Sequence, residues 1–272
     1  MAKSTSGADY QNVPRPVAAM ARDLPADHEI DWHSHPRFQV IYATEGVMTV
    51  DTKEETWVVP PMRAIWMPPK VAHRVRASGR VKMRTLYIQP AAATRMPAAC
   101  HALPVSPLLR ELIQRATEMP VEYSEAGAEG RVMQLILDEL ASAARLPYNL
   151  PMPVDADEAS LGRICRGLLA RPGEAATREA VAKRHGMTGR TLDRRFKREL
   201  GMNFGEWCRR AALLRALAWF AEGRAVTAVA LDLGYASPSA FCAMFKRATG
   251  RTPREYRRET LRASRGSAAP ST

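Results

Sequence analysis

The sequence predicts an α+β protein, with strands in its N-terminal half and only helices in its C-terminal half. Short runs of β-branched and aromatic residues, typical of strands, occur between Trp32 and Ile88. Beyond residue 155, Ala, Arg and Leu dominate between short turn clusters, which indicates helices. A chain of 272 residues is long enough for two domains of ordinary size.

Three prolines within seven residues, Pro147, Pro151 and Pro153, separate the two halves. Because a proline and the residue before it disfavour helix, we expect an extended connector here. We place domains at residues 13–146 and 157–262, joined by a Pro-rich linker at 147–156. We expect residues 1 to about 12, and those after about Ser264, to be disordered.

The N-terminal half alternates apolar runs with glycines. Runs at 40–43, 47–50, 75–77 and 81–88 are separated by Gly46 and Gly79, which predicts hairpins with glycine turns. Residues 106–119 and 129–145 then switch to helical spacing. This pair of helices is expected either to cover the sheet or to pair with another subunit.

The charge of the chain is concentrated in its C-terminal half. Residues 1–154 hold 17 Lys and Arg against 16 acids, net +1, whereas residues 155–272 hold 23 against 12, net +11. A polyanionic partner of the C-terminal half follows, and composition alone fits either nucleic acid or an acidic membrane surface. With no run of ~18 apolar residues and no signal peptide behind Lys3, we expect a soluble cytoplasmic protein. The four cysteines form no C-x-x-C pair and fit reduced thiols.

An internal repeat organises the C-terminal half. Val181, Ala182 and Gly186 recur 48 residues later, and Phe196-Lys197-Arg198 recurs 49 residues later as Phe245-Lys246-Arg247. Each copy predicts a short helix, a turn after glycine, and a second helix that begins at a hydroxyl N-cap, Thr188 or Ser237. A capping pair with Glu three residues on follows each copy, at Asn203 and at Thr252. This is the layout of two helix-turn-helix units.

The second helix of the first copy has a basic outer face. Leu192 and Phe196 lie four residues apart and are expected to face the core. Arginine on the opposite face can bond guanine N7 and O6 in the major groove, while flanking cations neutralise phosphates. A solvated charged face is the alternative, but the repeat and the +11 charge favour DNA. The candidate contacts are Thr188, Arg190, Thr191, Asp193, Arg194, Arg195, Lys197 and Arg198.

The second copy offers mostly small side chains at the corresponding positions. Its candidate contacts are Ser237, Ser239, Cys242, Ala243, Lys246 and Arg247. Small side chains give weaker base readout, such as contact with thymine methyl groups. We therefore predict that the first reading helix sets most of the sequence preference and that the second mainly docks on the backbone.

From about Asp157 to Tyr256 the chain resembles the DNA-binding domain of the AraC/XylS transcription regulators. The resemblance rests on Gly186 to Gly201, GMTGRTLDRRFKRELG, and on Ala236 to Tyr256. It implies two units, joined by a long helix from Asn203 to Glu222, that insert their second helices into successive major grooves of promoter double-stranded DNA. The second copy departs from the family pattern because it lacks the polar readers often found there.

The N-terminal half resembles a cupin. His33, His35, Gln39 and Gly46 have the spacing of the first cupin motif, H-x-H-x3-E-x6-G, with Gln39 in place of Glu. Pro68 to His73 has the spacing of the second, P-x-G-x2-H, with Lys70 in place of Gly. The resemblance implies a cupin-like β-barrel with the two helices beside it.

Three histidines are expected to meet inside this barrel. Side chains two apart share a strand face, so His33 and His35 point the same way, and His73 joins them from a paired strand. Three imidazoles suit a divalent transition metal such as Zn, Ni, Cu or Fe(II), whereas the neutral Gln39 fits a polar pocket for an organic effector. Candidate effector contacts are His33, His35, Gln39, Trp66, His73 and Tyr87, and candidate metal ligands are His33, His35 and His73. No cofactor is certain from the residues.

Two functions fit these features. The first is a transcription regulator, not an enzyme, that binds promoter DNA and a small-molecule effector as a homodimer, with RNA polymerase as a further partner and no membrane. The alternative is a metal-dependent cupin enzyme fused to a DNA-binding tether. Against the enzyme stand the missing acidic ligand and the lack of a general base at recognisable spacing from the histidines.

Overall fold

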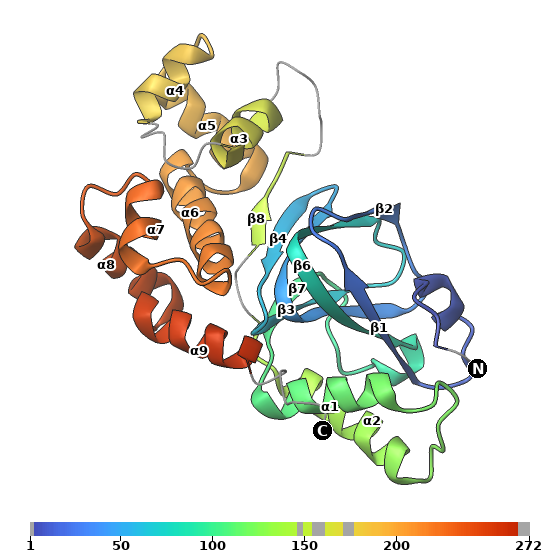
Figure 1. Ribbon diagram of the computed structural model, residues 1–272. Coiled ribbons are helices and arrows are strands. Elements are labelled where there is room, and N and C mark those ends of the chain that lie inside the picture. Colours follow the sequence, from blue (N-terminus) through green and yellow to red (C-terminus); the bar gives the residue numbers. More distant parts are fainter. Residues whose placement is uncertain (1–2, 146–148, 154–160, 171–176, 266–272) are drawn as a thin grey trace. The chain divides into compact units, whose positions relative to one another are not determined.

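The computed structural model describes residues 3–145, 149–153, 161–170 and 177–265. Two compact units make up the chain (Figure 1). The first contains Met1–Thr52, Val59–Pro147 and Ala263–Thr272, and the second contains Lys53–Val58 and Tyr148–Arg262. Among the described residues, no helix is both long and apolar enough to cross a membrane.

Two long strands, β3 (Phe38–Thr52) and β6 (His73–Ile88), pair along the middle of the first unit. Three strands extend the sheet around one half of this pair. On one side, β1 (Val17–Leu24) pairs with β6. On the other, β5 (Arg63–Met67) pairs with β3 and in turn with β7 (His101–Pro104). Around the other half, β2 (Glu29–His33) pairs with the start of β6. The long strands therefore pass from one part of the sheet into the other.

Gly46 and Gly79 lie inside these long strands, so the expected glycine-turn hairpins are wrong. Pairing of β3 with β6 continues on both sides of Gly46, with register shifts between Ala43 and Val47. Both glycines have positive φ, +79° and +72°. A glycine at a bulge bends a strand without ending it, and here it lets one strand serve both parts of the sheet.

The first unit is a sheet-rich domain with two helices, as predicted, although its sheet is open. The described strands leave β1 and β7 at separate edges, with no ladder joining them. The architecture is thus cupin-like in its bent sheet without being a closed barrel.

Helices α1 (Pro107–Glu118) and α2 (Ala128–Ser142) confirm the predicted helical pair. They lie side by side against the sheet (Figure 1) and share a buried core with it. Strand residues Val40, Tyr42 and Trp66 face this core, together with Leu109 and Ile113 of α1. One face of the sheet is therefore filled by the helices.

The N-terminal segment is ordered, which contradicts the expected disorder of residues 1 to about 12. A short 3-10 helix, η1 (Gly7–Tyr10), places Tyr10 at 2% exposure with its ring 6.0 Å from that of Tyr87. Arg37 donates to the carbonyl oxygen of Gln11 at 2.9 Å. An aromatic anchor and a buried arginine outweigh the polar composition of the segment, while residues 1–2 and the tail from 266 lie outside the described residues.

The second unit is helical apart from β8 (Asn149–Pro151) and most of β4 (Glu55–Val59), two antiparallel strands that pair with each other. Its helices are α3 (Leu161–Ala170), α4 (Arg178–Arg184), α5 (Gly189–Leu200), α6 (Phe204–Ala221), α7 (Val226–Asp232), α8 (Pro238–Thr249) and α9 (Pro253–Arg265). The helix pairs α4–α5 and α7–α8 reproduce the repeat offsets of 48 and 49 residues.

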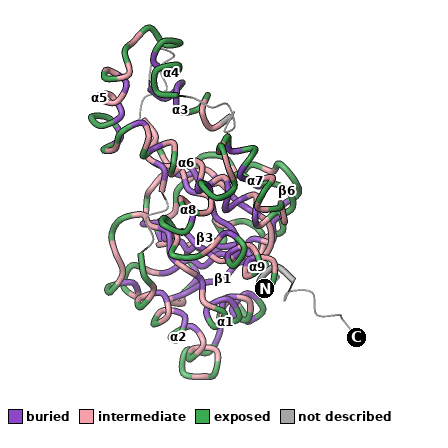
Figure 2. The backbone as a smooth tube through the Cα atoms, turned by 90° about the vertical axis from the view of Figure 1, so that its left-hand side faces the viewer, coloured by how far each residue is buried: buried purple, intermediate pink, exposed green. Residues whose placement is uncertain are grey.

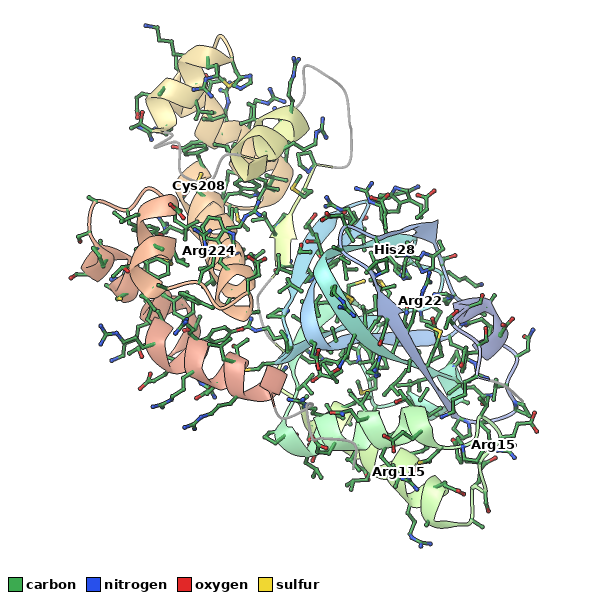
Figure 3. All side chains as sticks on the ribbon, in the orientation of Figure 1. Arg15, Arg22, His28, Arg115, Cys208 and Arg224 are labelled. Carbon is green, nitrogen blue, oxygen red and sulfur yellow. The ribbon has the colours of Figure 1, made fainter. Side chains whose placement is uncertain are left out.

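Part of the expected linker belongs to the second unit. Trp207 of α6 donates its indole N–H to the carbonyl oxygen of Pro151 at 2.9 Å, and Arg210 donates to that of Asn149 at 3.2 Å. Linker residues 147–148 and 154–156 lie outside the described residues. None of the four cysteines, all of which the structure describes, forms a disulfide; Figure 3 labels Cys208 on α6.

Candidate DNA-binding surface and histidine cluster

The two predicted reading helices begin and end as their sequences require. Thr188 accepts from the backbone N–H of Thr191, and Ser237 accepts from that of Ala240. Each helix ends at a left-handed glycine, Gly201 or Gly250. The hydroxyl groups of Thr188 and Ser237 thus serve as caps, whatever else they contact.

The outer face of α5 carries unpaired cations. Leu192, Phe196 and Leu200 are buried, whereas Arg190, Arg194 and Lys197 are exposed at spacings of four and three residues. In the part of the chain that the structure describes, these three cations form no ion pair. Figure 2 shows α5 coloured mainly as half-buried and exposed, in agreement with the exposure of these three residues.

Other predicted contacts on α5 are already engaged within the protein. Arg195 and Arg198 pair with Glu199 at 3.2 Å and 2.7 Å. Asp193 accepts from the backbone N–H of Phe204 at 3.1 Å and pairs with Arg178 at 2.7 Å. Asp193 therefore links three consecutive helices, α4, α5 and α6.

On α8 the exposed cations lie near the C-terminal end. Ser239, Ala243, Lys246 and Arg247 are exposed, and Cys242 is half-buried. Only small side chains precede Lys246 on this face. The exposed face of α8 therefore carries small side chains where the exposed face of α5 carries cations.

Helix α6 joins the two helix-turn-helix units, α4–α5 and α7–α8, and packs on each of them through a similar aromatic cluster. At its start, Phe196 lies 5.4 Å from Phe204 and 5.8 Å from Trp207 between ring centroids. At its end, Phe220 lies 5.5 Å from Phe245 and 6.5 Å from Tyr256. Its 18 residues span roughly 27 Å, comparable with the ~34 Å of one turn of B-DNA. An asparagine capping box fixes its start, as predicted at Asn203.

In the first unit the three predicted histidines come together. The ring centroids of His33 and His73 are 4.3 Å apart, and those of His33 and His35 are 4.9 Å apart. One ligand nitrogen from each histidine lies within 4.8 Å of the others. The register explains this, because His33 on β2 pairs directly with His73 on β6.

Gln39 and Tyr87 connect to this cluster from the other part of the sheet. The ring of Tyr87 lies 5.0 Å from that of His35, edge to face. Gln39 donates its amide N–H to Tyr87 Oη at 3.4 Å and to Thr85 Oγ1 at 3.1 Å. Five predicted effector contacts thus form one connected group.

Trp66 is the exception among the predicted effector contacts. Its ring stacks on Phe38 at 4.7 Å, and its indole N–H donates to the carbonyl oxygen of Pro97 at 2.8 Å. It belongs to the core shared with α1 and α2. The structure therefore places Trp66 on the helix-covered face of the sheet and away from the histidines.

Comparisons with known proteins match both halves of the chain. Residues 20–144 match the AraC-like ligand binding domain, and residues 181–259 match a helix-turn-helix domain. The HTH-type transcriptional regulator NimR of Escherichia coli (strain K12) is 31% identical over 238 residues, which is 88% of this chain and 86% of NimR. The chain belongs to the AraC family of transcription regulators.

Two further similarities have narrower scope. Regulatory protein SoxS of Salmonella typhimurium is 36% identical over 80 residues, 29% of this chain and 75% of SoxS. The crystal structure of ToxT from Vibrio cholerae O395 covers 89% of this chain and 97% of its own, with 11% identity and a TM-score of 0.36. A likeness this weak carries no conclusion about function.

The electrostatics of the AraC-family ligand-binding domain keep two of its clustered imidazoles neutral. Burial, with the neighbouring His33 and His73, lowers the pKa of His35 to about 4. Burial likewise lowers the pKa of His73 to about 4, against the hydrogen bond from its ring to the Val71 carbonyl oxygen. Both rings are uncharged at neutral pH.

Sequence reasoning missed the segment that covers the cluster. A Cβ at Gly7 would lie 2.4 Å from Tyr87 Oη and 3.2 Å from His35 Cε1, so η1 packs closely on both side chains. Tyr10 stacks on Tyr87 from the same segment. The only available signal was a lone tyrosine in a polar stretch.

Proposed function

We propose that this AraC-family regulator reads promoter DNA mainly through α5, while α8 docks mainly on the DNA backbone. The observation that carries this is the pair of outer faces: Arg190, Arg194 and Lys197 are exposed on α5, whereas α8 offers small side chains before Lys246. Arginine supports bidentate readout of guanine, and small side chains do not. Phosphate contacts are assigned to Lys197, Lys246 and Arg247, and to Arg198, whose side chain is 68% exposed although it pairs with Glu199.

The double variant Arg190→Ala/Arg194→Ala tests this reading. Each bidentate arginine–guanine pair is worth about 1–3 kcal/mol of discrimination, so specific binding should weaken by about 2–6 kcal/mol. Fluorescence anisotropy with a duplex selected from a random library, against a scrambled duplex, measures the loss. The matched control is Arg80→Ala/Arg131→Ala, which removes two exposed arginines from the ligand-binding domain. Unchanged discrimination in the α5 variant would contradict the proposal.

The basic charge of the second half supports a strong salt dependence of binding. Each neutralised phosphate contributes a slope of ~0.9 in log affinity against log salt. A flat salt response would remove the phosphate roles given to Lys197, Arg198, Lys246 and Arg247.

We propose that the histidine cluster, with Gln39 and Tyr87, forms the effector site of the ligand-binding domain. The support is the connected group of imidazole, amide and phenol side chains under η1. We assign no catalytic role to these side chains. Substitution at the cluster should change the transcriptional response and leave DNA binding by the second unit intact.

We also propose a cytoplasmic homodimer, with RNA polymerase as the partner of the DNA-bound form. Two large apolar side chains, Leu108 on α1 and Leu135 on α2, are 49% and 41% exposed, which supports contact between subunits through these helices. Leu108→Asp/Leu135→Asp should yield monomers in sedimentation velocity. Leu231→Asp, at a 64% exposed leucine on α7, should leave the dimer unchanged. A monomeric wild-type protein would contradict the dimer.

A further inference from the structure

We propose that the exposed face of α9, which carries Arg254, Arg258 and Arg262, binds DNA phosphates beyond the groove assigned to α8. The inference rests on the DNA binding proposed above and adds to it a contact surface outside the two reading helices. Three observations carry it: a row of unpaired arginines, the packing that fixes the direction of this row, and its position beside the phosphate-contacting end of α8.

Three arginines form a row along the surface of α9. Arg254, Arg258 and Arg262 are exposed and recur every four residues, so they lie ~6 Å apart along the helix axis. In the part of the chain that the structure describes, none of the three forms a hydrogen bond or an ion pair. Like charges at this spacing on a helix repel one another. An anion bound along the row relieves that repulsion.

Other arginines of this region are engaged within the protein. Arg251 pairs with Glu259. Arg257 donates to the carbonyl oxygens of Gly223 and Arg224 at 2.7 Å and 2.8 Å, and so holds the turn that follows α6. These contacts stabilise the helical unit itself. The three arginines of the row make no such contact, so the fold does not account for them.

The opposite face of α9 is fixed against the core of the helical unit. Tyr256 is 3% exposed, and its ring lies 5.6 Å from that of Phe245 on α8. Thr260, one turn further on, is fully buried. Each arginine of the row is two positions from one of these buried residues, which is about half a turn around the helix. The row therefore points away from the core and into solvent.

The row begins close to the predicted phosphate contacts of α8. Helix α9 starts three residues after α8 ends, and Lys246 and Arg247 are exposed in the last turn of α8 (Figure 1). Hydrogen bonds from Thr252, and then nearby positive charges, lower the pKa of Glu255 in the first turn of α9. Those charges are Lys246 on α8 and Arg258 on α9. The two cationic surfaces thus meet at one carboxylate and are continuous.

DNA phosphates suit this row better than an acidic protein surface does. A DNA strand carries one phosphate per about 3.4 Å of helix axis, so a row ~12 Å long lies along three to four phosphates. Protein interfaces usually have an apolar centre. Among the described residues, α9 carries none of the large apolar side chains that are exposed. A cationic face without an apolar anchor is typical of contact with the DNA backbone.

Duplexes with different flanks test the proposal with full-length protein. Both contain the same selected site: the short duplex ends at the base pairs beneath α8, and the long one extends by about one helical turn, ~10 bp, on that side. Wild-type protein should bind the long duplex more tightly. Arg254→Ala/Arg258→Ala/Arg262→Ala should bind both duplexes equally. An extension on the α5 side is the control and should affect the two proteins alike.

The salt dependence gives the size of the effect. Three phosphate contacts contribute ~2.7 to the slope of log affinity against log salt, at ~0.9 each. On the long duplex, the affinity ratio of wild type to triple alanine variant should therefore fall ~40-fold between about 50 and 200 mM salt.

Two further variants show whether charge is what matters. Lysine at all three positions of the row should retain most of the slope, because a phosphate contact needs a positive charge more than a guanidinium group. Arg80→Ala/Arg131→Ala/Arg145→Ala removes three exposed arginines from the first unit and should leave the slope unchanged. Circular dichroism establishes that each variant is folded.

The outcomes separate this surface from the reading helices. Phosphate contacts carry no sequence information, so the triple alanine variant should keep the discrimination that Arg190→Ala/Arg194→Ala loses. Wild-type protein that binds the site but gains nothing from the longer flank overturns the α9 surface alone. Wild-type protein that binds no DNA overturns both proposals. An unchanged slope in the folded triple alanine variant also overturns the α9 surface and leaves the row to an acidic protein partner.

Discussion

At the scale of single residues, Asp193 shows how a side chain predicted to read DNA can instead hold the reading helix. Its carboxylate accepts from the Phe204 backbone N–H, at the first residue of α6, and pairs with Arg178 on α4. Carboxylates at helix N-termini are favourable because they satisfy free N–H groups. We therefore assign Asp193 to positioning α5 against its neighbours.

Asp193→Ala should lower the free energy of unfolding by about 1.5–3 kcal/mol, the usual value of hydrogen bonds to a charged group. Binding to specific and scrambled DNA should weaken by similar factors, since no base contact is lost. Urea denaturation and anisotropy measure the two effects. Asp232→Ala, which removes an ion pair with Arg224 on the surface, is the control and should cost less. A loss of binding to specific DNA alone would indicate that Asp193 contacts a base, and would contradict its assignment to positioning α5.

Prediction of single residues succeeded where strand periodicity alone places a side chain, and failed where the pairing register determines which face of the sheet the side chain occupies. The H-x-H spacing and a third histidine on a paired strand sufficed to bring the cluster together. Trp66 failed because β5 pairs Met67 with Gln39 and Trp66 with Val40, so one position along the strand changes the face. Sequence alone does not fix that register.

At the scale of elements, the helices were predictable because their signals are local. The caps Thr188, Asn203 and Ser237, and the positions of α5, α6 and α8, follow from residues within each helix. The bend of β3 and β6 depends on pairing between strands about 30 residues apart in the chain, because a positive-φ glycine serves a turn and a bulge equally well. Whether such a glycine forms a turn or a bulge depends on the strand with which its own strand pairs.

Gly46 and Gly79 offer a matched test of the bend. Both have positive φ, but a Cβ at Gly46 would lie 2.2 Å from the Arg80 carbonyl oxygen, whereas a Cβ at Gly79 meets nothing within 4 Å. Alanine at either position costs about 1–2 kcal/mol for its left-handed backbone. Gly46→Ala should cost a further ~1–3 kcal/mol from the clash. Thermal unfolding should therefore rank Gly46→Ala below Gly79→Ala, and equal melting temperatures would contradict the bulge.

At the scale of the whole molecule, the charge distribution and the division into units agree in outline. The sequence placed a net charge of +11 after residue 154, and most of the residues that carry it belong to the helical unit that contains both reading helices. The boundary was less predictable: Lys53–Val58, far from the linker in sequence, groups with the second unit through the ladder of β4 with β8. Pairing between strands that are far apart in the chain could not be predicted from the residues within each strand.

The central claim is that two reading helices contact successive major grooves with unequal roles. A systematic base-substitution scan of a selected binding site tests it most directly. The account predicts two contacted segments about 10 bp apart for each chain, with penalties of about 1–3 kcal/mol for substitutions under α5 and much smaller ones under α8. Arg190→Ala/Arg194→Ala should flatten only the first segment. Equal penalties in both segments, or one contacted segment, would contradict the account.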